Sequence, residues 1–304
     1  MFSKIVKSTA LLLFAASSLA AANFNEGAEK DRLEMIKFFE AKFEDASKNS
    51  ARFFPYSDPE ELDQKYEKDI KHMDFNIGSY AYSKDAKFQY EQLKEMPPYE
   101  DAIDAGEELY TKKFANGNSL QTCFPDLTNA GTYPYFDEKT QKMVSLTSAI
   151  NDCLRANGEK PWGTKKGPMA EFQAYYVNES KEAGKDFDIK IESEAAKAAY
   201  ERGKEYYYSQ RGYLKLSCAT CHVDGSGKRV RNEILSPLLG QVTHFPVVRL
   251  RWGDIGTVER RLSGCVVDQG QVPPADESQE MIELLYFQAY MSNGMPVDGP
   301  DVRK

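Results

Sequence analysis

The segment from Ser217 to His222 reads Ser-Cys-Ala-Thr-Cys-His and holds two thiols and an imidazole about one helical turn apart. The spacing C-x-x-C-H is the attachment signature of c-type haem. Cys218 and Cys221 would add across the two vinyl groups of the porphyrin, and His222 would supply an axial nitrogen to the iron. A zinc site would need a second ligand pair at short spacing, and none occurs. A thioredoxin-like pair needs no adjacent histidine. The motif therefore predicts one covalently bound c-type haem.

A haem iron has a second axial position, and the sequence offers few side chains for it. Residues 223–280 contain no methionine, the ligand that many small cytochromes use. The remaining candidates are His244, Cys265, Met291 and Met295. Cys265 is the fifth of five cysteines, and an unpaired thiol in an oxidising compartment needs an explanation. Ligation of its thiolate to ferric iron would provide one.

Sequence features recur in the same order in two parts of the chain. Pro134–Cys153 and Pro246–Cys265 each span 19 residues, at an offset of 112. Phe-Gln-Ala-Tyr at 172–175 recurs at 287–290, and a similar glycine-containing helical segment precedes the cysteine motif of each half. Self-similarity of this kind indicates an internal duplication. We therefore expect a mainly α protein with two tandem cytochrome c-like domains.

The first copy lacks the residues for haem attachment. Aligned on the first cysteine of the motif, it reads Cys-Phe-Pro-Asp-Leu at 123–127, with one cysteine and no histidine. This half is therefore predicted to be a haemless structural copy. Cys123 and Cys153 correspond to an attachment cysteine and to Cys265, so without a porphyrin between them they could meet as a disulfide. Closing that 30-residue interval would stabilise the fold by on the order of 3 kcal/mol.

The N-terminus has the features of a signal peptide. Lys4 and Lys7 form a positive region, residues 9–16 form a short apolar region, and small residues follow. The apolar run is too short to span a bilayer, so we expect export to the periplasm and no membrane span after processing. That compartment is also where c-type haem is attached.

Composition narrows the class of partner. The chain of 304 residues is 41% hydrophobic, enough for one large core or two small ones. Its net charge of −8 makes nucleic acid an unsuitable partner, because phosphate binding needs a basic surface. The stretch between Cys218 and Cys265 instead carries seven Lys and Arg against four Asp and Glu. A local positive field inside an acidic protein suits a small anion.

These patterns divide the chain into five expected segments. They are a signal peptide at 1–22, an N-terminal extension at 23–98, a haemless cytochrome c-like domain at 99–178, a linker at 179–193 and a haem-binding cytochrome c domain at 194–304. The extension is expected to open with a helix whose apolar face is formed by Leu33, Ile36, Phe39 and Phe43.

Three motifs together resemble the SoxA subunits of the SoxAX cytochromes of bacterial thiosulfate oxidation. They are the haem motif at 218–222, His-Phe-Pro-Val-Val-Arg-Leu-Arg-Trp at 244–252 and Thr-Val-Glu-Arg-Arg-Leu-Ser-Gly-Cys at 257–265. The resemblance covers essentially the whole mature chain. Some family members carry haem in both halves. This chain departs from them at 123–127 and resembles the single-haem type, with a disulfide between Cys123 and Cys153 instead.

The resemblance implies a role for each site residue. Haem would be bound through Cys218 and Cys221 with His222 as proximal ligand. Cys265 would be the distal ligand and the active-site sulfur, and Arg261 would hold the thiosulfate anion. Whether Cys265 carries an additional sulfur as a persulfide is left open by the sequence. The implied activity is that of an L-cysteine S-thiosulfotransferase, which joins thiosulfate oxidatively to a cysteine of the SoxYZ carrier. Two electrons would leave through the haem to a c-type cytochrome, and the subunit would form a heterodimer with SoxX.

The residue chemistry is compatible with this activity and also with a simpler one. Forming an S–S bond from two thiol-level sulfurs releases two electrons, and a haem supplies the first acceptor. The planar fork of Arg261 matches an oxyanion, whereas the adjacent Arg260 is expected to be solvated or salt-bridged. Two roles remain open for His244, anion binding and structural packing. The alternative function is a periplasmic electron-transfer cytochrome without its own substrate, in which Cys265 only tunes the haem.

Overall fold

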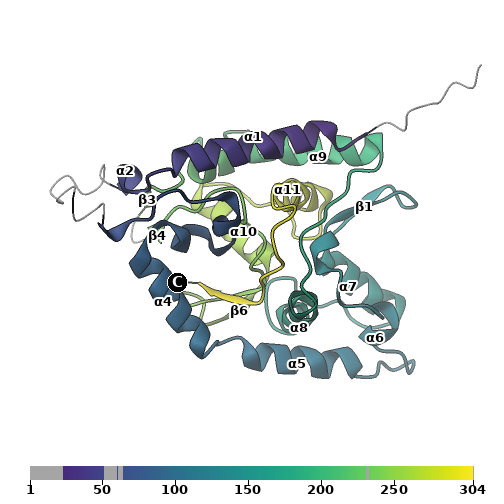
Figure 1. Cartoon of the computed structure of the whole chain (residues 1–304). Helices are drawn as coiled ribbons and strands as arrows, with labels where there is room; N and C mark the ends of the chain where they lie inside the picture. The colour runs from purple at the N-terminus through teal and green to yellow at the C-terminus, as the bar shows by residue number, and fades with distance from the viewer. Residues whose placement is uncertain (1–22, 51–59, 61–63, 231–232, 304) are drawn as a thin grey trace, which may run out of the picture.

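The fold is taken from a computed structural model that describes residues 23–50, 60, 64–230 and 233–303 (Figure 1). The expected signal peptide at 1–22 lies outside the described residues. Helices dominate and strands are short, which confirms the predicted mainly α class. Within the described ranges, no helix is both long and apolar enough to cross a membrane.

The two predicted cytochrome c-like halves share a long helix, a short helical turn, a two-stranded hairpin and two further helices in the same order, and the second half has additional short strands. The first half contains α5 (Glu100–Thr111), α6 (Leu120–Cys123), η2 (Ala130–Thr132), β1 (Tyr135–Asp137), β2 (Lys142–Val144), α7 (Leu146–Ala156) and α8 (Pro168–Glu182). The second contains α9 (Glu194–Tyr208), η3 (Thr220–Asp224), β3 (Arg229–Val230), β4 (Glu233–Ile234), β5 (Val247–Arg249), β6 (Asp254–Gly256), α10 (Val258–Asp268), α11 (Gln279–Tyr290) and β7 (Asp301–Arg303). The hairpin and helix β1–β2–α7 recur as β5–β6–α10, shifted by the predicted 112 residues. The tandem arrangement is confirmed.

Each half is built on a crossing of two helices with glycine at the point of contact. In the second half, a Cβ on Gly203 would lie 2.0 Å from the carbonyl oxygen of Glu283. In the first half, a Cβ on Gly106 would lie 2.2 Å from the carbonyl oxygen of Glu171. No larger residue fits at these distances, so glycine is what lets α9 reach α11 and α5 reach α8.

These crossings correct one predicted equivalence. Gly106 also contacts Tyr175, and Gly203 contacts Phe287, which lies 112 residues further on. Structurally, Tyr175 therefore corresponds to Phe287. The predicted match of Phe-Gln-Ala-Tyr at 172–175 with 287–290 is wrong by three residues. An error of nearly one helical turn keeps the same face of the helix, which is why the sequence comparison did not reveal it.

The N-terminal extension packs on the second half. It contains α1 (Glu26–Lys42), α2 (Ser47–Ser50), η1 (His72–Tyr82) and α4 (Lys84–Glu95). Helix α1 lies along α9 (Figure 1), where Lys204 pairs with Asp31 at 2.6 Å. The predicted apolar face of α1 is correct for Phe39 and Phe43, which are fully buried, but wrong for Leu33, which is 52% exposed. The buried stripe is narrower than predicted because only one edge of α1 contacts the protein.

One apolar core runs through both halves and the extension. Helix α8 continues to Glu182, past residue 178, and Phe187, Ile189 and Ile191 of the expected linker are buried in this core. Polar contacts also join the halves. The side chain of Gln279 on α11 accepts a hydrogen bond from the backbone N–H of Met143 on β2 at 2.7 Å and donates to its carbonyl oxygen at 3.2 Å.

Candidate haem and sulfur site

A cavity of about 580 Å³ lies between the second half and the N-terminal extension and is lined by several of the predicted site residues. Cys218, His222, Arg261 and Cys265 all face it, although they come from segments up to 47 residues apart. Cys221 is half-buried on η3 and does not belong to the lining. Burial, reinforced by the charge of Cys265, raises the pKa of the Cys221 thiol.

Local hydrogen bonds form the turn that carries the haem motif. The hydroxyl of Ser217 accepts the backbone N–H of Thr220 at 3.0 Å, and the hydroxyl of Thr220 accepts the backbone N–H of Ser217 at 3.1 Å. This reciprocal cap starts the turn. At its end, the N–H of Gly225 donates to the carbonyl of Thr220 at 3.0 Å.

His222 is held in the form that binds iron. Its side chain is half-buried, and Nδ1 donates to the carbonyl oxygen of Ser236 at 2.9 Å, which leaves Nε2 with a free lone pair. Burial lowers the pKa of His222 to about 4 against the effect of the Ser236 hydrogen bond, and the charge of Arg261 lowers it further. A neutral imidazole fixed by a backbone carbonyl is the usual arrangement of a metal-bound histidine. The residues present therefore fit a c-type haem.

Cys265 and Arg261 lie one helical turn apart on α10, and both face the cavity. The hydroxyl of Thr257 caps this helix by accepting the N–H of Arg260 at 3.4 Å. Cys218 also lines the cavity, and burial together with the charge of Cys265 raises its pKa to about 12. Cys265 thus lines the same cavity as Cys218, the first cysteine of the C-x-x-C-H motif.

The two adjacent arginines on α10 have different surroundings. Arg260 donates to Asp254 at 2.5 Å, and its guanidinium lies 4.3 Å from the ring centroid of Trp252. Arg260 therefore forms an ion pair with Asp254 and packs on Trp252. Arg261 instead lines the cavity, where its fork is available for an anion.

The cavity carries a positive charge. Its lining has five basic side chains, Lys65, Arg229, Arg249, Arg261 and Arg303, and two acidic ones, Asp85 and Glu233. Two of the basic side chains form ion pairs, since Arg249 donates to Glu233 at 3.1 Å and Arg303 pairs with Asp301, which is not among the lining residues. Sequence reasoning missed Lys65 and Arg303 because they come from the extension and from β7, far from the haem motif. No local pattern marks either residue.

The other candidates for the second axial position divide into two groups. His244 is half-buried and lines the cavity, and within the described part of the chain its buried Nδ1 has no hydrogen-bond partner. Burial and the charges of Arg303, Arg261 and Arg249 lower the pKa of His244 well below its usual value, so the ring is neutral. Met291 and Met295 are each 1% exposed within the apolar core and are not among the lining residues.

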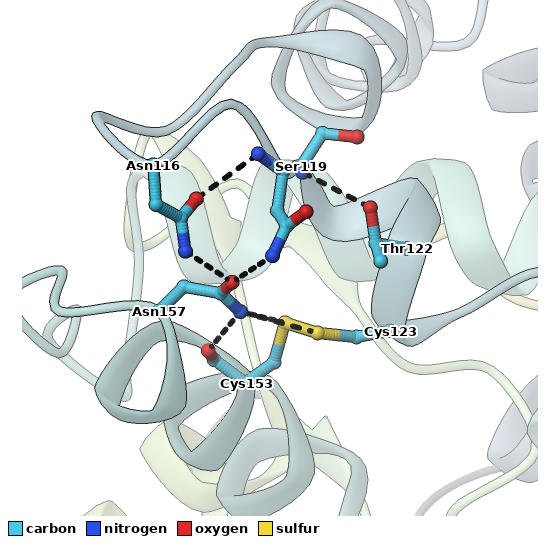
Figure 2. Close-up of a disulfide and its surroundings, with 7 residues drawn as sticks. Asn116, Ser119, Thr122, Cys123, Cys153 and Asn157 are labelled. Atoms are coloured by element: carbon cyan, nitrogen blue, oxygen red, sulfur yellow. Dashed lines mark hydrogen bonds between the residues drawn. A yellow bond between two sulfur atoms is a disulfide. The ribbon is translucent and has the colours of Figure 1, made fainter.

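The equivalent place in the first half holds a disulfide. Cys123 and Cys153 are bonded to each other, and the amide nitrogen of Asn157 donates to the carbonyl oxygen of Cys153 at 2.9 Å and contacts the sulfur of Cys123 at 3.6 Å (Figure 2). Asn116 and Asn118 each donate to the side-chain oxygen of Asn157 at 2.8 Å. A network of asparagine side chains thus lies beside the bridge, which is exposed at Cys123.

The first half also contains a turn equivalent to the one that carries the C-x-x-C-H motif. The N–H of Ser119 donates to the hydroxyl of Thr122 at 3.3 Å, the same cap that Ser217 and Thr220 form before η3. The two turns therefore align as Ser-Leu-Gln-Thr-Cys-Phe, residues 119–124, and Ser-Cys-Ala-Thr-Cys-His, residues 217–222. The predicted alignment on the first cysteine is wrong by three positions, because the cap rather than the cysteine marks the start of the turn.

In this alignment, Cys123 corresponds to Cys221 and Phe124 to His222. The ring of Phe124 is buried and lies 5.6 Å from Tyr176 and 5.8 Å from Phe172, measured between centroids. An aromatic ring packed on aromatic neighbours has replaced the imidazole.

Comparisons with known proteins agree with this geometry. Residues 105–184 and 202–297 match the family described as SoxA/TsdA, cytochrome c domain. The chain is 47% identical over 237 residues to the L-cysteine S-thiosulfotransferase subunit SoxA of Chlorobaculum tepidum, covering 78% of this chain and 82% of that protein. The SoxA subunit of Allochromatium vinosum is 39% identical over 232 residues, covering 76% and 83%.

A solved structure shares the fold. The crystal structure of SoxXA from P. pantotrophus matches with a TM-score of 0.66 and 28% identity, covering 71% of this chain and 84% of that chain. Sequence, duplication and fold lead to the same assignment: the chain belongs to the SoxA family of L-cysteine S-thiosulfotransferase subunits, which are c-type cytochromes.

Proposed function

We propose that this chain joins thiosulfate oxidatively to a cysteine of a SoxYZ-type carrier protein. The observation that carries the proposal is that Cys265 and Arg261 line the same cavity as Cys218 and His222. A reactive sulfur, an anion-binding guanidinium and a haem-binding motif are thereby within one enclosed space. The activity named for the relatives in the SoxA family supports the same reaction.

The proposed cofactor is a single c-type haem, bound covalently through Cys218 and Cys221. His222 is the proximal ligand and Cys265 the distal ligand and active-site sulfur. When bound, the haem supplies a redox group that takes up electrons one at a time. No second haem is proposed, because Phe124 stands where the first half would need a histidine.

The residues around the cavity favour a doubly negative substrate. The net positive lining attracts thiosulfate, and Arg261 donates to its oxygens as a planar fork. The outer sulfur of thiosulfate forms an S–S bond with the carrier cysteine, whose thiol loses its proton. Two electrons are released, and a c-type cytochrome is their final acceptor.

The proposed setting follows from the same family. The P. pantotrophus structure is a SoxXA complex, so we propose a heterodimer with a SoxX-like cytochrome in the periplasm, after removal of residues 1–22. We also propose the domain division derived from the sequence, with an extension at 23–98, a haemless domain at 99–178, a linker at 179–193 and a haem-binding domain at 194–304.

The test uses the purified haem-loaded protein with its partner, thiosulfate and a thiol carrier, and follows the reduction of added cytochrome c. We expect C265A to lose turnover and to keep its haem. The matched control is V267A, at an exposed position of α10 outside the cavity lining. If C265A turns over at the wild-type rate, the enzyme proposal fails, and the alternative of an electron-transfer cytochrome without its own substrate is favoured.

A further inference from the structure

The last residue of α1 contacts the turn that carries His222. The Nζ of Lys42 donates to the carbonyl oxygen of Val223 at 2.8 Å and to that of Asp224 at 3.0 Å. Val223 and Asp224 are the final two residues of η3. Carbonyl groups at the end of a helical segment lack partners within it and are stabilised by a cation. Lys42 therefore caps the haem-motif turn from a point 181 residues earlier in the chain.

An aromatic cluster holds the ammonium group of Lys42 in place. Its Nζ lies 5.6 Å from the ring centroid of Phe38 and 6.0 Å from that of Phe43. Phe43 is fully buried and stacks on Tyr82 of η1 with 4.4 Å between centroids, and it also meets Phe75 edge-on. The position of Lys42 is thus determined by the core of the extension.

The extension also contacts the segment that orients the imidazole. The hydroxyl of Tyr82 donates to the carbonyl of Leu235 at 3.4 Å. The next residue, Ser236, supplies the carbonyl that accepts the Nδ1 proton of His222. Gly78, at φ +62°, lies against Ser236, where a Cβ on the glycine would be 3.7 Å from the serine Cβ. Both sides of the His222–Ser236 hydrogen bond are therefore in contact with the extension.

We propose that the N-terminal extension positions the proximal imidazole, with Lys42 as the principal positioning residue. Lys42 holds η3 at one side and Tyr82 holds residues 235–236 at the other, so the ring of His222 keeps one orientation. This inference rests on the proposed function, in which His222 is the proximal ligand. It gives the extension a role in the site itself, since hydrogen bonds to a ligand's second nitrogen set its orientation and basicity.

The chemistry of Lys42 indicates which substitutions separate positioning from stability. Methionine has a similar length but no donor, so K42M leaves the carbonyls of Val223 and Asp224 without this partner. The hydroxyl of Ser226 still donates to the carbonyl of Val223 at 3.0 Å, but the link from α1 to η3 is lost, which lets η3 shift against residues 235–236. Arginine carries several N–H groups on a planar fork and can bridge two carbonyls, so K42R should rescue the cap.

The experiment compares haem-loaded wild type, K42M, K42R and K37M. Lys37 is an exposed residue of the same helix, so K37M makes the same chemical change away from η3. Haem content is measured by the pyridine haemochrome spectrum, ring orientation by the electron paramagnetic resonance of the oxidised haem, and the reduction potential by titration. We expect K42M to retain haem but to show more than one set of g-values and a shifted potential. K42R and K37M should give the single set of the wild type.

Each outcome has a distinct meaning. If K42M matches K37M in g-values and potential, the positioning role is wrong, even if K42M unfolds more readily. If the wild type itself carries no covalent haem, the proposed function fails first and this inference with it. If K42M yields no folded holoprotein, Y82F replaces it, because that change removes only the hydroxyl at Leu235 and keeps the stack on Phe43. Wild-type g-values in Y82F would then overturn the proposal.

Discussion

Replacing both cysteines of the Cys123–Cys153 disulfide by alanine should lower the free energy of unfolding by about 3.6 kcal/mol at 25 °C. The bridge closes 30 residues, and the loss of loop-closure entropy in an unfolded chain of that length gives this magnitude. The folded state should change little. Asn157 keeps its hydrogen bonds to Asn116, Asn118 and the Cys153 backbone, none of which involves the bridging sulfurs.

The measurement is urea denaturation of the haem-loaded C123A/C153A variant, followed by far-ultraviolet circular dichroism. A phosphine reductant provides the second arm, because it cleaves a disulfide and leaves the thioether bonds of a c-type haem intact. Wild type in the reductant should be destabilised as much as the double variant, and the double variant should not respond to the reductant.

Two results would refute this reasoning. A loss of less than about 1 kcal/mol in both arms would show that the unfolded chain gains little freedom when the bridge opens. A changed visible spectrum in the folded variant would show that the bridge supports the haem cavity directly, although neither cysteine is among the residues that line it.

Three further predictions concern the cavity, a buried carboxyl group and the crossing of α9 and α11. R261Q should lower kcat/KM for thiosulfate by about tenfold to a hundredfold, the scale of a hydrogen bond between charged groups, whereas R260Q should lower thermal stability with turnover nearly unchanged. Burial raises the pKa of Glu259 from 4.5 to about 7, so the folded protein holds a proton that the unfolded chain releases. The free energy of unfolding should therefore fall as pH rises from about 4.5 to 7, and E259Q should flatten that slope in denaturant titrations. G203A should lower the free energy of unfolding by about 1–3 kcal/mol or more through overpacking at α11, whereas G264A, where a Cβ meets nothing within 4 Å, should not destabilise the protein.

Features with a local cause were predictable from the sequence. The C-x-x-C-H motif and the 19-residue spacing from proline to cysteine in each half are local patterns. The structure repeats β1–β2–α7 as β5–β6–α10 at the offset of 112 residues that this spacing predicted. The alignment of the turn at 119–124 with the turn at 217–222 was not predictable from Cys123. Ser119 and Thr122 set the turn, and a hydroxyl cap is a weaker sequence signal than a thiol.

Features that depend on distant contacts could not be predicted. Lys65 and Arg303 reach the cavity only because the extension and β7 pack around the second half. Tyr90 of α4 illustrates this, since its hydroxyl donates to Asp301 at 2.8 Å across 211 positions. The strands of the two repeated hairpins are three residues long, too short to show an alternating pattern.

The core shared by the two halves explains why a copy without a cofactor would persist. The side chain of Gln279 forms hydrogen bonds with both the backbone N–H and the carbonyl oxygen of Met143. A Cβ on Gly299 would lie 3.0 Å from the side chain of Val177, so the two halves are closely packed. Deleting the first half would strip this covering from α11 and expose apolar surface to water. Selection that preserves the second half therefore also preserves the first half, because the core of the second half is completed by it.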